Sequence, residues 1–153
     1  MIRLALVAAA LILAVLSVHG PCPGAAPPDE GALIAVLGAD KPVAEKAAAC
    51  RDLKTVGTAR AVPALAPLLA DKDLSHWARW ALESMPCPEA GAALREALAK
   101  TSGLVQAGIA DSLGERRDGE AVAALARLAV GDDAQVAASA AAALGKIGGA
   151  DAA

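Results

Sequence analysis

The segment 137–148, AASAAAALGKIG, decides the expected fold of this 153-residue chain. It is rich in alanine, which has the highest helix propensity of any residue. The segment ends in a Leu-Gly-x-Ile-Gly sequence, and weaker copies of this helix end occur three times upstream. The leucine that anchors each copy therefore recurs, at intervals of 29, 31 and 31 residues: Leu53, Leu82, Leu113 and Leu144.

A second series of leucines has one member before each anchor and recurs at intervals of 32, 29 and 31 residues: Leu33, Leu65, Leu94 and Leu125. Two landmarks that recur with one period predict stacked repeats rather than a single globular bundle. We expect first helices over 31–38, 61–70, 89–100 and 120–130 and second helices over 42–56, 75–85, 103–116 and 134–147. Short connections of about two to five residues make consecutive helices antiparallel. Three glycines at helix ends are expected in left-handed turns: Gly57, Gly114 and Gly148.

The pattern Val136-x3-Ala140-Ala141-x-Ala143-Leu144-Gly145-x-Ile147-Gly148 resembles the second helix of short HEAT repeats, a bacterial type also found in bilin-lyase-like proteins. The sequences VPAL at 62–65 and VAAL at 122–125 resemble the first helix. The resemblance covers about 29–153 and is weakest in the second unit. It implies an all-α, right-handed α-solenoid of about four antiparallel hairpins at 30–57, 58–87, 88–117 and 118–148, with a further repeat starting at 149–153. The motif predicts the architecture and gives almost no information about activity.

The composition limits the function classes. The chain has two Trp, no Tyr and no Phe, yet 56% of its residues are hydrophobic, so its core must consist of small aliphatic contacts. The formal net charge is −3 and no basic stripe is visible, so we expect no nucleic-acid partner. A single histidine outside the N-terminal segment, with no cluster of cysteines or acids, indicates no metal site and no cofactor.

The two ends of the chain carry expectations of their own. Arg3 precedes an uncharged segment at 4–18, shorter than the roughly 20 residues of a bilayer span, so residues 1–24 are expected to be a signal peptide. An uncleaved membrane anchor is the alternative, and 25–29 would be a Pro-rich linker. The chain is then exported, periplasmic or secreted. Residues 148–153 align with 57–62, the turn that opens a first helix. We therefore expect that the chain is a fragment of a longer repeat protein or that a partner covers the exposed face of the last repeat. A native C-terminus that frays is the alternative.

Several polar or reactive residues have local interpretations. Cys50 and Cys87 are expected to be small buried hydrophobes, although export would permit a disulfide between them. Arg79 is expected to pair with Glu83 four residues on. The sequence ERRD at 115–118 is expected to be a solvated turn.

The second unit departs from the other copies. Five residues of its second helix are expected to face the core: Leu74, Ala78, Ala81, Leu82 and Met85. Trp77 and Trp80 then fall on the inner, concave ridge, where the neighbouring units have Ala48 and Arg51 or Gly108 and Asp111. Exposed tryptophans with charged rims are typical of binding surfaces. We therefore identify candidate partner-binding residues, with packing of the rings against small neighbours as the alternative: Trp77, Trp80, His76, Arg51 and Asp111.

These observations favour a non-enzymatic scaffold that binds a protein or peptide on the concave helix face. The partner would be protein or peptide, and the membrane would be contacted only through an N-terminal anchor. The alternative is an enzyme or enzyme subunit resembling HEAT-type chromophore lyases. A third hypothesis is nucleic-acid binding, as in HEAT-type DNA glycosylases, which use a basic groove with aromatics; the net negative charge and the expected export signal argue against it.

Overall fold

The computed structural model describes residues 28–148. The expected signal or anchor segment, most of the linker and the expected start of a fifth repeat lie outside the described residues. Within 28–148, every regular element is helical, with eight α-helices and three short 3-10 helices. The expected all-α fold is confirmed for this part of the chain. None of its helices is both long enough and apolar enough to span a bilayer.

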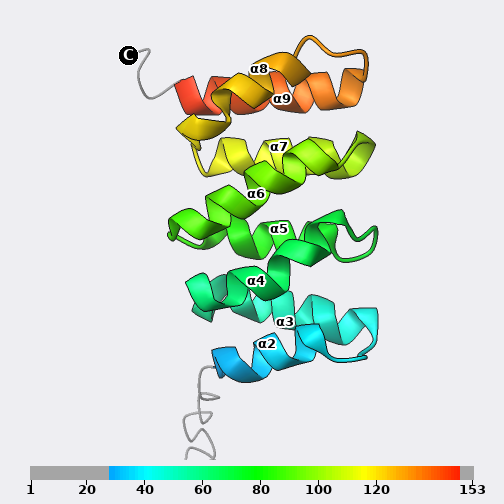
Figure 1. Ribbon diagram of the computed structural model, residues 1–153, viewed down its shortest axis with the longest axis vertical. Coiled ribbons are helices and arrows are strands. Elements are labelled where there is room, and N and C mark those ends of the chain that lie inside the picture. Colours follow the sequence, from blue (N-terminus) through cyan, green and yellow to red (C-terminus); the bar gives the residue numbers. More distant parts are fainter. Residues whose placement is uncertain (1–27, 149–153) are drawn as a thin grey trace, which may run out of the picture.

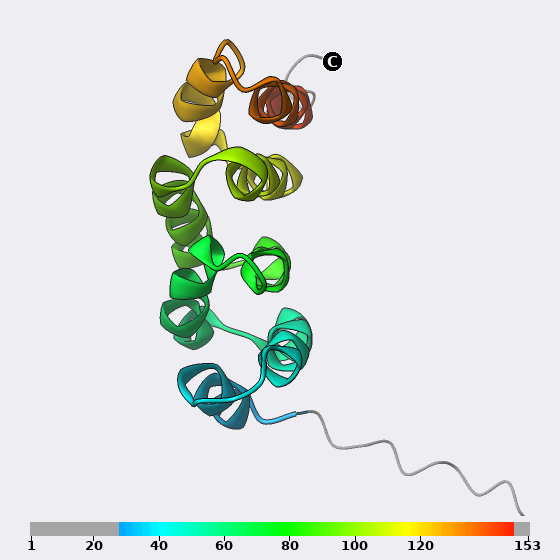
Figure 2. The ribbon, with the colours of Figure 1, turned by 90° about the vertical axis from the view of Figure 1, so that its right-hand side faces the viewer.

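The helices form two layers (Figures 1 and 2). One layer contains α2 (Glu30–Gly38), α4 (Val62–Leu65), α6 (Pro88–Lys100) and α8 (Val122–Leu128). The other contains α3 (Val43–Val56), α5 (Ser75–Ser84), α7 (Gly103–Glu115) and α9 (Ala134–Gly148). Figure 2 shows a gently curved stack with α3, α5, α7 and α9 on its inner side. We call the exposed side of these four helices the inner face.

The first helix of the second unit is broken, unlike the expected continuous helix over 61–70. It consists of η1 (Ala59–Ala61), α4 and η2 (Ala66–Ala70). Pro67 lacks an N–H, and its ring is placed against the carbonyl of Pro63 four residues earlier, so the α-helical ladder cannot continue. The fourth unit likewise opens with a 3-10 turn, η3 (Gly119–Ala121), before α8.

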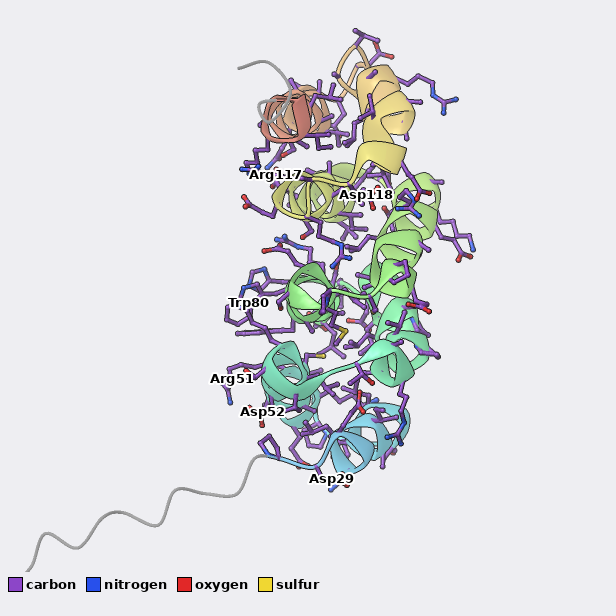
Figure 3. All side chains as sticks on the ribbon, turned by 90° about the vertical axis from the view of Figure 1, so that its left-hand side faces the viewer. Asp29, Arg51, Asp52, Trp80, Arg117 and Asp118 are labelled. Carbon is purple, nitrogen blue, oxygen red and sulfur yellow. The ribbon has the colours of Figure 1, made fainter. Side chains whose placement is uncertain are left out.

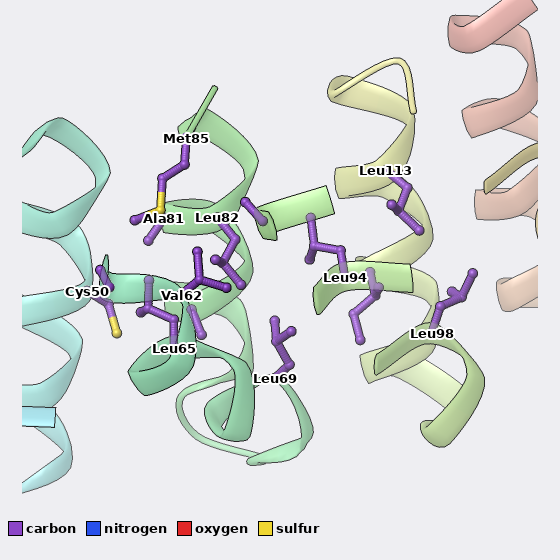
Figure 4. Close-up of a cluster of buried hydrophobic side chains, with 14 of the residues drawn as sticks. Cys50, Val62, Leu65, Leu69, Ala81, Leu82, Met85, Leu94, Leu98 and Leu113 are labelled. Carbon is purple, nitrogen blue, oxygen red and sulfur yellow. The ribbon is translucent and has the colours of Figure 1, made fainter. Parts of the chain in front are cut away.

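The core is aliphatic. Figure 4 shows leucines from α4, η2, α5, α6 and α7 packed together with Cys50, Val62 and Met85. All five residues that the sequence turned inward on α5 are at most 3% exposed. The equivalent Val136, Ala140 and Ala143 of α9 are buried as well. Small side chains and leucines therefore fill the space between the layers without any aromatic ring among the fully buried residues.

The glycines at helix ends have a different role from the one expected. Gly57 has a φ of −69°, and the positive φ angles among the described residues belong to Gly103 and Arg117. Gly114 permits close approach instead: a Cβ there would lie 2.7 Å from the Cα and 2.8 Å from the Cβ of Ala143 on α9. The left-handed prediction is wrong for Gly57 and Gly114, because helix packing rather than turn geometry requires the missing side chain.

The turn at 115–118 is not a solvated turn. Arg116 Nη1 donates to the carbonyl oxygens of Leu82 at 2.7 Å and Met85 at 2.5 Å, and Nη2 donates to that of Cys87 at 3.1 Å. Asp118, with a side chain only 8% exposed, forms an ion pair with Arg95 of α6. Two of its four charged side chains therefore join the third unit to its neighbours, because the carbonyls at the end of α5 need donors.

Both described cysteines are free thiols, so they form no disulfide. Cys50 is fully buried, as a small hydrophobe would be, and this burial raises the pKa of its thiol to about 11. Cys87 is half-buried at the start of α6.

Candidate functional site

Three rings gather on α5. The ring centroids of His76 and Trp77 are 5.2 Å apart in an edge-on arrangement, and those of Trp77 and Trp80 are 6.1 Å apart. His76 is stacked on Trp80 at 6.4 Å with an interplanar angle of 17°. The opposite side of α5 faces the core with Ala78, Ala81 and Leu82, while Trp77 is half-buried and packs against the edge of the core. We call His76, Trp77 and Trp80 the ring cluster.

Lys54 contacts the ring cluster, although the sequence alone did not predict this contact. Its ammonium nitrogen lies 3.7 Å from the centroid of a Trp80 ring. A cation over an indole face contributes about 0.5–1 kcal/mol at an exposed site. Lys54 lies in the last turn of α3, three residues after Arg51, and this spacing is the signal that could have revealed it.

Arg79 crosses to the next unit instead of pairing with Glu83. Its Nη1 donates to the carbonyl oxygen of Gly108 at 3.1 Å and to Ser112 Oγ at 3.3 Å, both on α7. A Cβ on Gly108 would lie 2.8 Å from Arg79 Nε, so glycine leaves the space that the guanidinium occupies. The expected Arg79–Glu83 pair is wrong, because acceptors on α7 are within reach and are shielded from water.

The Arg79 guanidinium also determines the tautomer of the His76 imidazole. Arg79 Nη2 lies 3.2 Å from His76 Nδ1. Since a guanidinium can only donate, Nδ1 must accept, and the ring proton of the neutral imidazole then lies on Nε2. His76 therefore presents a donor from its other nitrogen.

Arg51 and Asp111 have different places relative to the cluster. Figure 3 shows Arg51 on α3 and Trp80 on α5 projecting from the same side of the inner layer. The Arg51 side chain is 58% exposed, and its Nε is 4.0 Å from Asp52. Among the interactions between described residues, none joins Asp111 to the rings. The structure thus brings Trp77, Trp80 and His76 together, with Arg51 on the adjacent helix and Asp111 outside the cluster.

Asp111 belongs to a second, acidic group. Glu115 accepts a hydrogen bond from Lys146 Nζ at 2.6 Å, which joins α7 to α9. This hydrogen bond raises the pKa of Lys146, and the charges of Glu115, Asp111 and Glu83 raise it further. Glu115 and Lys146 therefore form an ion pair between α7 and α9, and Asp111 lies four residues before Glu115 on α7.

The two tryptophans differ in their surroundings. Trp77 packs against the core, whereas Trp80 is half-buried under Lys54 and beside His76. The packing alternative therefore applies in part to Trp77, because its ring contacts the core. The neighbours of Trp80 are mainly the polar side chains of Lys54 and His76.

The outer layer has a shallow apolar groove between η2 and α6, with a volume of about 350 Å³. Pro63, Pro67, Ala93 and Ala97 line it, and the Glu96–Lys100 ion pair lies at its rim. In residues 28–148, no three His, Cys, Asp or Glu side chains are grouped so that they could hold a metal ion.

Comparison with known families places this part of the chain. Residues 76–100, which contain the ring cluster and run from α5 through α6, match the family described as PBS lyase HEAT-like repeat. This segment is similar to a HEAT-like repeat. The resemblance drawn from the sequence is confirmed over these residues, which comprise the second helix of the second unit, where the motif is weakest by inspection, and the first helix of the third unit. Among curated proteins, none matches this chain.

Proposed function

We propose that the chain is part of a right-handed α-solenoid that binds a protein or peptide on its inner face without catalysing a reaction on it. The two-layered stack and the HEAT-like repeat at 76–100 support the solenoid. Stacked helical repeats create extended surfaces of this kind.

The position of the tryptophans carries the proposal. The chain has two large aromatic residues, and leucine and alanine fill the core without them: Trp77 is half-buried against the core, and Trp80 is half-buried under Lys54. A large flat ring that is not needed inside the protein, supported by a neighbouring cation, is typical of an interface residue that contributes strongly to binding.

A displayed library of random peptides, selected against the full chain, tests the proposal. Removing the Trp80 ring with Trp80→Ala should weaken the best selected peptide at least about tenfold, or about 1.4 kcal/mol. Isothermal titration calorimetry measures the affinity, and circular dichroism checks that the helices persist.

Val130→Ala is the matched control, because Val130 is an apolar side chain 86% exposed in the turn after α8, on the outer layer. It should leave the affinity within about twofold of wild type. Equal binding to wild type and Trp80→Ala would contradict the proposal, as would a selection that yields no peptide better than its scrambled version.

We also propose that the chain works outside the cytoplasm, on the basis of the uncharged segment at 4–18 behind Arg3. Cell fractionation with mass spectrometry of the N-terminus tests this. The chain should appear in an exported or membrane fraction; a cytosolic chain with an intact N-terminus would contradict it.

A further inference from the structure

The groups around Trp80 on the inner face are mainly donors and cations: the Lys54 ammonium, the Arg51 guanidinium, two indole N–H groups and the Nε2–H of His76. Glu83, about one helical turn after Trp80, is the carboxylate on α5. Among the ion pairs between described residues, Lys54 has none and Arg51 has only the 4.0 Å contact with Asp52. A group with many donors and few acceptors favours an anionic partner.

Toward α7 and α9, the balance reverses. Glu115 is paired with Lys146, and Asp111, four residues before Glu115 on α7, adds a carboxylate that forms no ion pair among the described residues. This region repels a second anion and favours a cation. The inner face is therefore electrostatically polar along the direction in which the helices stack.

An apolar surface accompanies these charges. The Trp80 ring lies beside the Lys54 ammonium. Packed helices are about 8–10 Å apart, so Lys54 on α3 and Asp111 on α7 are separated by about two helix spacings.

We propose that the partner is an extended peptide segment with an acidic residue and a basic residue about five or six residues apart and apolar side chains between them. Its acidic residue lies over Lys54 and Arg51, its apolar side chains contact Trp80, and its basic residue lies over Asp111. This inference rests on the proposed function and names the chemistry of the partner. A nucleic acid fits less well, because its continuous phosphates would meet the carboxylates on α7.

Three fluorescein-labelled synthetic peptides test the inference against the full chain by fluorescence anisotropy. They share one apolar centre and differ in their end residues: acidic and basic, both acidic, or both basic. The mixed peptide should bind wild type at least about fivefold more tightly than either of the others. Lys54→Glu should shift the preference to the doubly basic peptide, and Asp111→Lys should shift it to the doubly acidic one.

Arg127→Glu is the matched charge reversal, since Arg127 lies on α8 in the outer layer and, among residues 28–148, donates to the Ala123 carbonyl of its own helix and to no other group. It should leave the order of the three peptides unchanged. Equal affinities for the three peptides, an unchanged order in Lys54→Glu and Asp111→Lys, dissociation constants above about 1 mM for all three, or displacement by single-stranded DNA would each overturn the inference. The proposed function would survive these results if library-selected peptides still depended on Trp80; it fails only if no peptide does.

Discussion

The α7–α9 pair and the α3–α5 pair occupy equivalent places in the stack but are built differently. On α7 and α9, Gly114 and Ala143 let the two backbones approach closely. Between α3 and α5, Lys54 reaches over Trp80, and indole rings take the places that Gly108 and Asp111 have one unit later. The regular unit uses small side chains for packing, and the irregular unit uses large ones at the surface. A departure from the repeat motif therefore marks surface chemistry, while agreement with it marks packing.

The largest expected effect is on the close-packed pair. Gly114→Ala should lower the free energy of unfolding by about 2–3 kcal/mol, because the added methyl meets the backbone of Ala143 and α9 must move. Urea denaturation followed by circular dichroism measures this change.

Gly145→Ala is its control at the equivalent position one unit later. A Cβ there meets nothing within 4 Å, so alanine should leave stability unchanged or raise it by up to about 1 kcal/mol through helix propensity. Equal destabilisation by both substitutions would show that close packing at Gly114 is not what distinguishes this pair.

The next effect is at the junction between the two regions. Arg116→Ala should cost about 2 kcal/mol, because the carbonyls at the end of α5 lose a charged donor while remaining partly buried. Arg117→Ala, at an exposed neighbour, should change the unfolding free energy by less than about 0.5 kcal/mol. If Arg116→Ala changes the unfolding free energy as little as Arg117→Ala in the same denaturation experiment, the hydrogen bonds of Arg116 contribute no stability.

These contacts also mark the limit of prediction from sequence. The leucine series placed the second helices within about one residue at each end, since helical periodicity is local and repeats itself. It also identified the buried side of α5. Arg116 and Arg79 escaped because their acceptors lie 29 to 34 residues away, in other units, where local helix spacing gives no information. Lys54 could have been identified from its place three residues after Arg51, but its contact with Trp80 could not, because that ring is on the next second helix.

A smaller effect separates the two tryptophans. Trp77→Ala should cost about 1–2 kcal/mol of unfolding free energy, because its ring packs against the core. Trp80→Ala should cost less than about 1 kcal/mol, since its ring loses mainly the contact with the Lys54 ammonium. If Trp80→Ala proves the more destabilising of the two in urea, the packing explanation applies to both rings.

The smallest effect is expected where Glu30 of α2 meets Thr58, outside the α3–α5 and α7–α9 contacts. The Thr58 N–H and hydroxyl donate to Glu30 Oε1 at 2.6 and 2.8 Å, and these hydrogen bonds hold the pKa of Glu30 below its ordinary value of 4.5. Its folded-state pKa is thus below the unfolded one, so its contribution is present above about pH 4.5 and is lost as the pH falls through the folded pKa.

Glu30→Gln should therefore slightly lower the melting temperature at pH 7, and the difference from wild type should shrink as the pH falls below 4.5. Thermal melts at several pH values measure it. A difference that stays constant with pH would mean that the charge of Glu30 is not what stabilises this contact.

The central claim is that the ring cluster provides binding while the close-packed pair provides stability. One paired experiment tests it most directly: the affinity for a library-selected peptide and the unfolding free energy, both measured for Trp80→Ala and Gly114→Ala at a temperature where both variants are folded. Trp80→Ala should lose at least about tenfold in affinity with little loss of stability, and Gly114→Ala should lose stability with its affinity within about twofold of wild type. A Trp80→Ala variant that retains its affinity, or that loses affinity only in step with its stability, would contradict the claim.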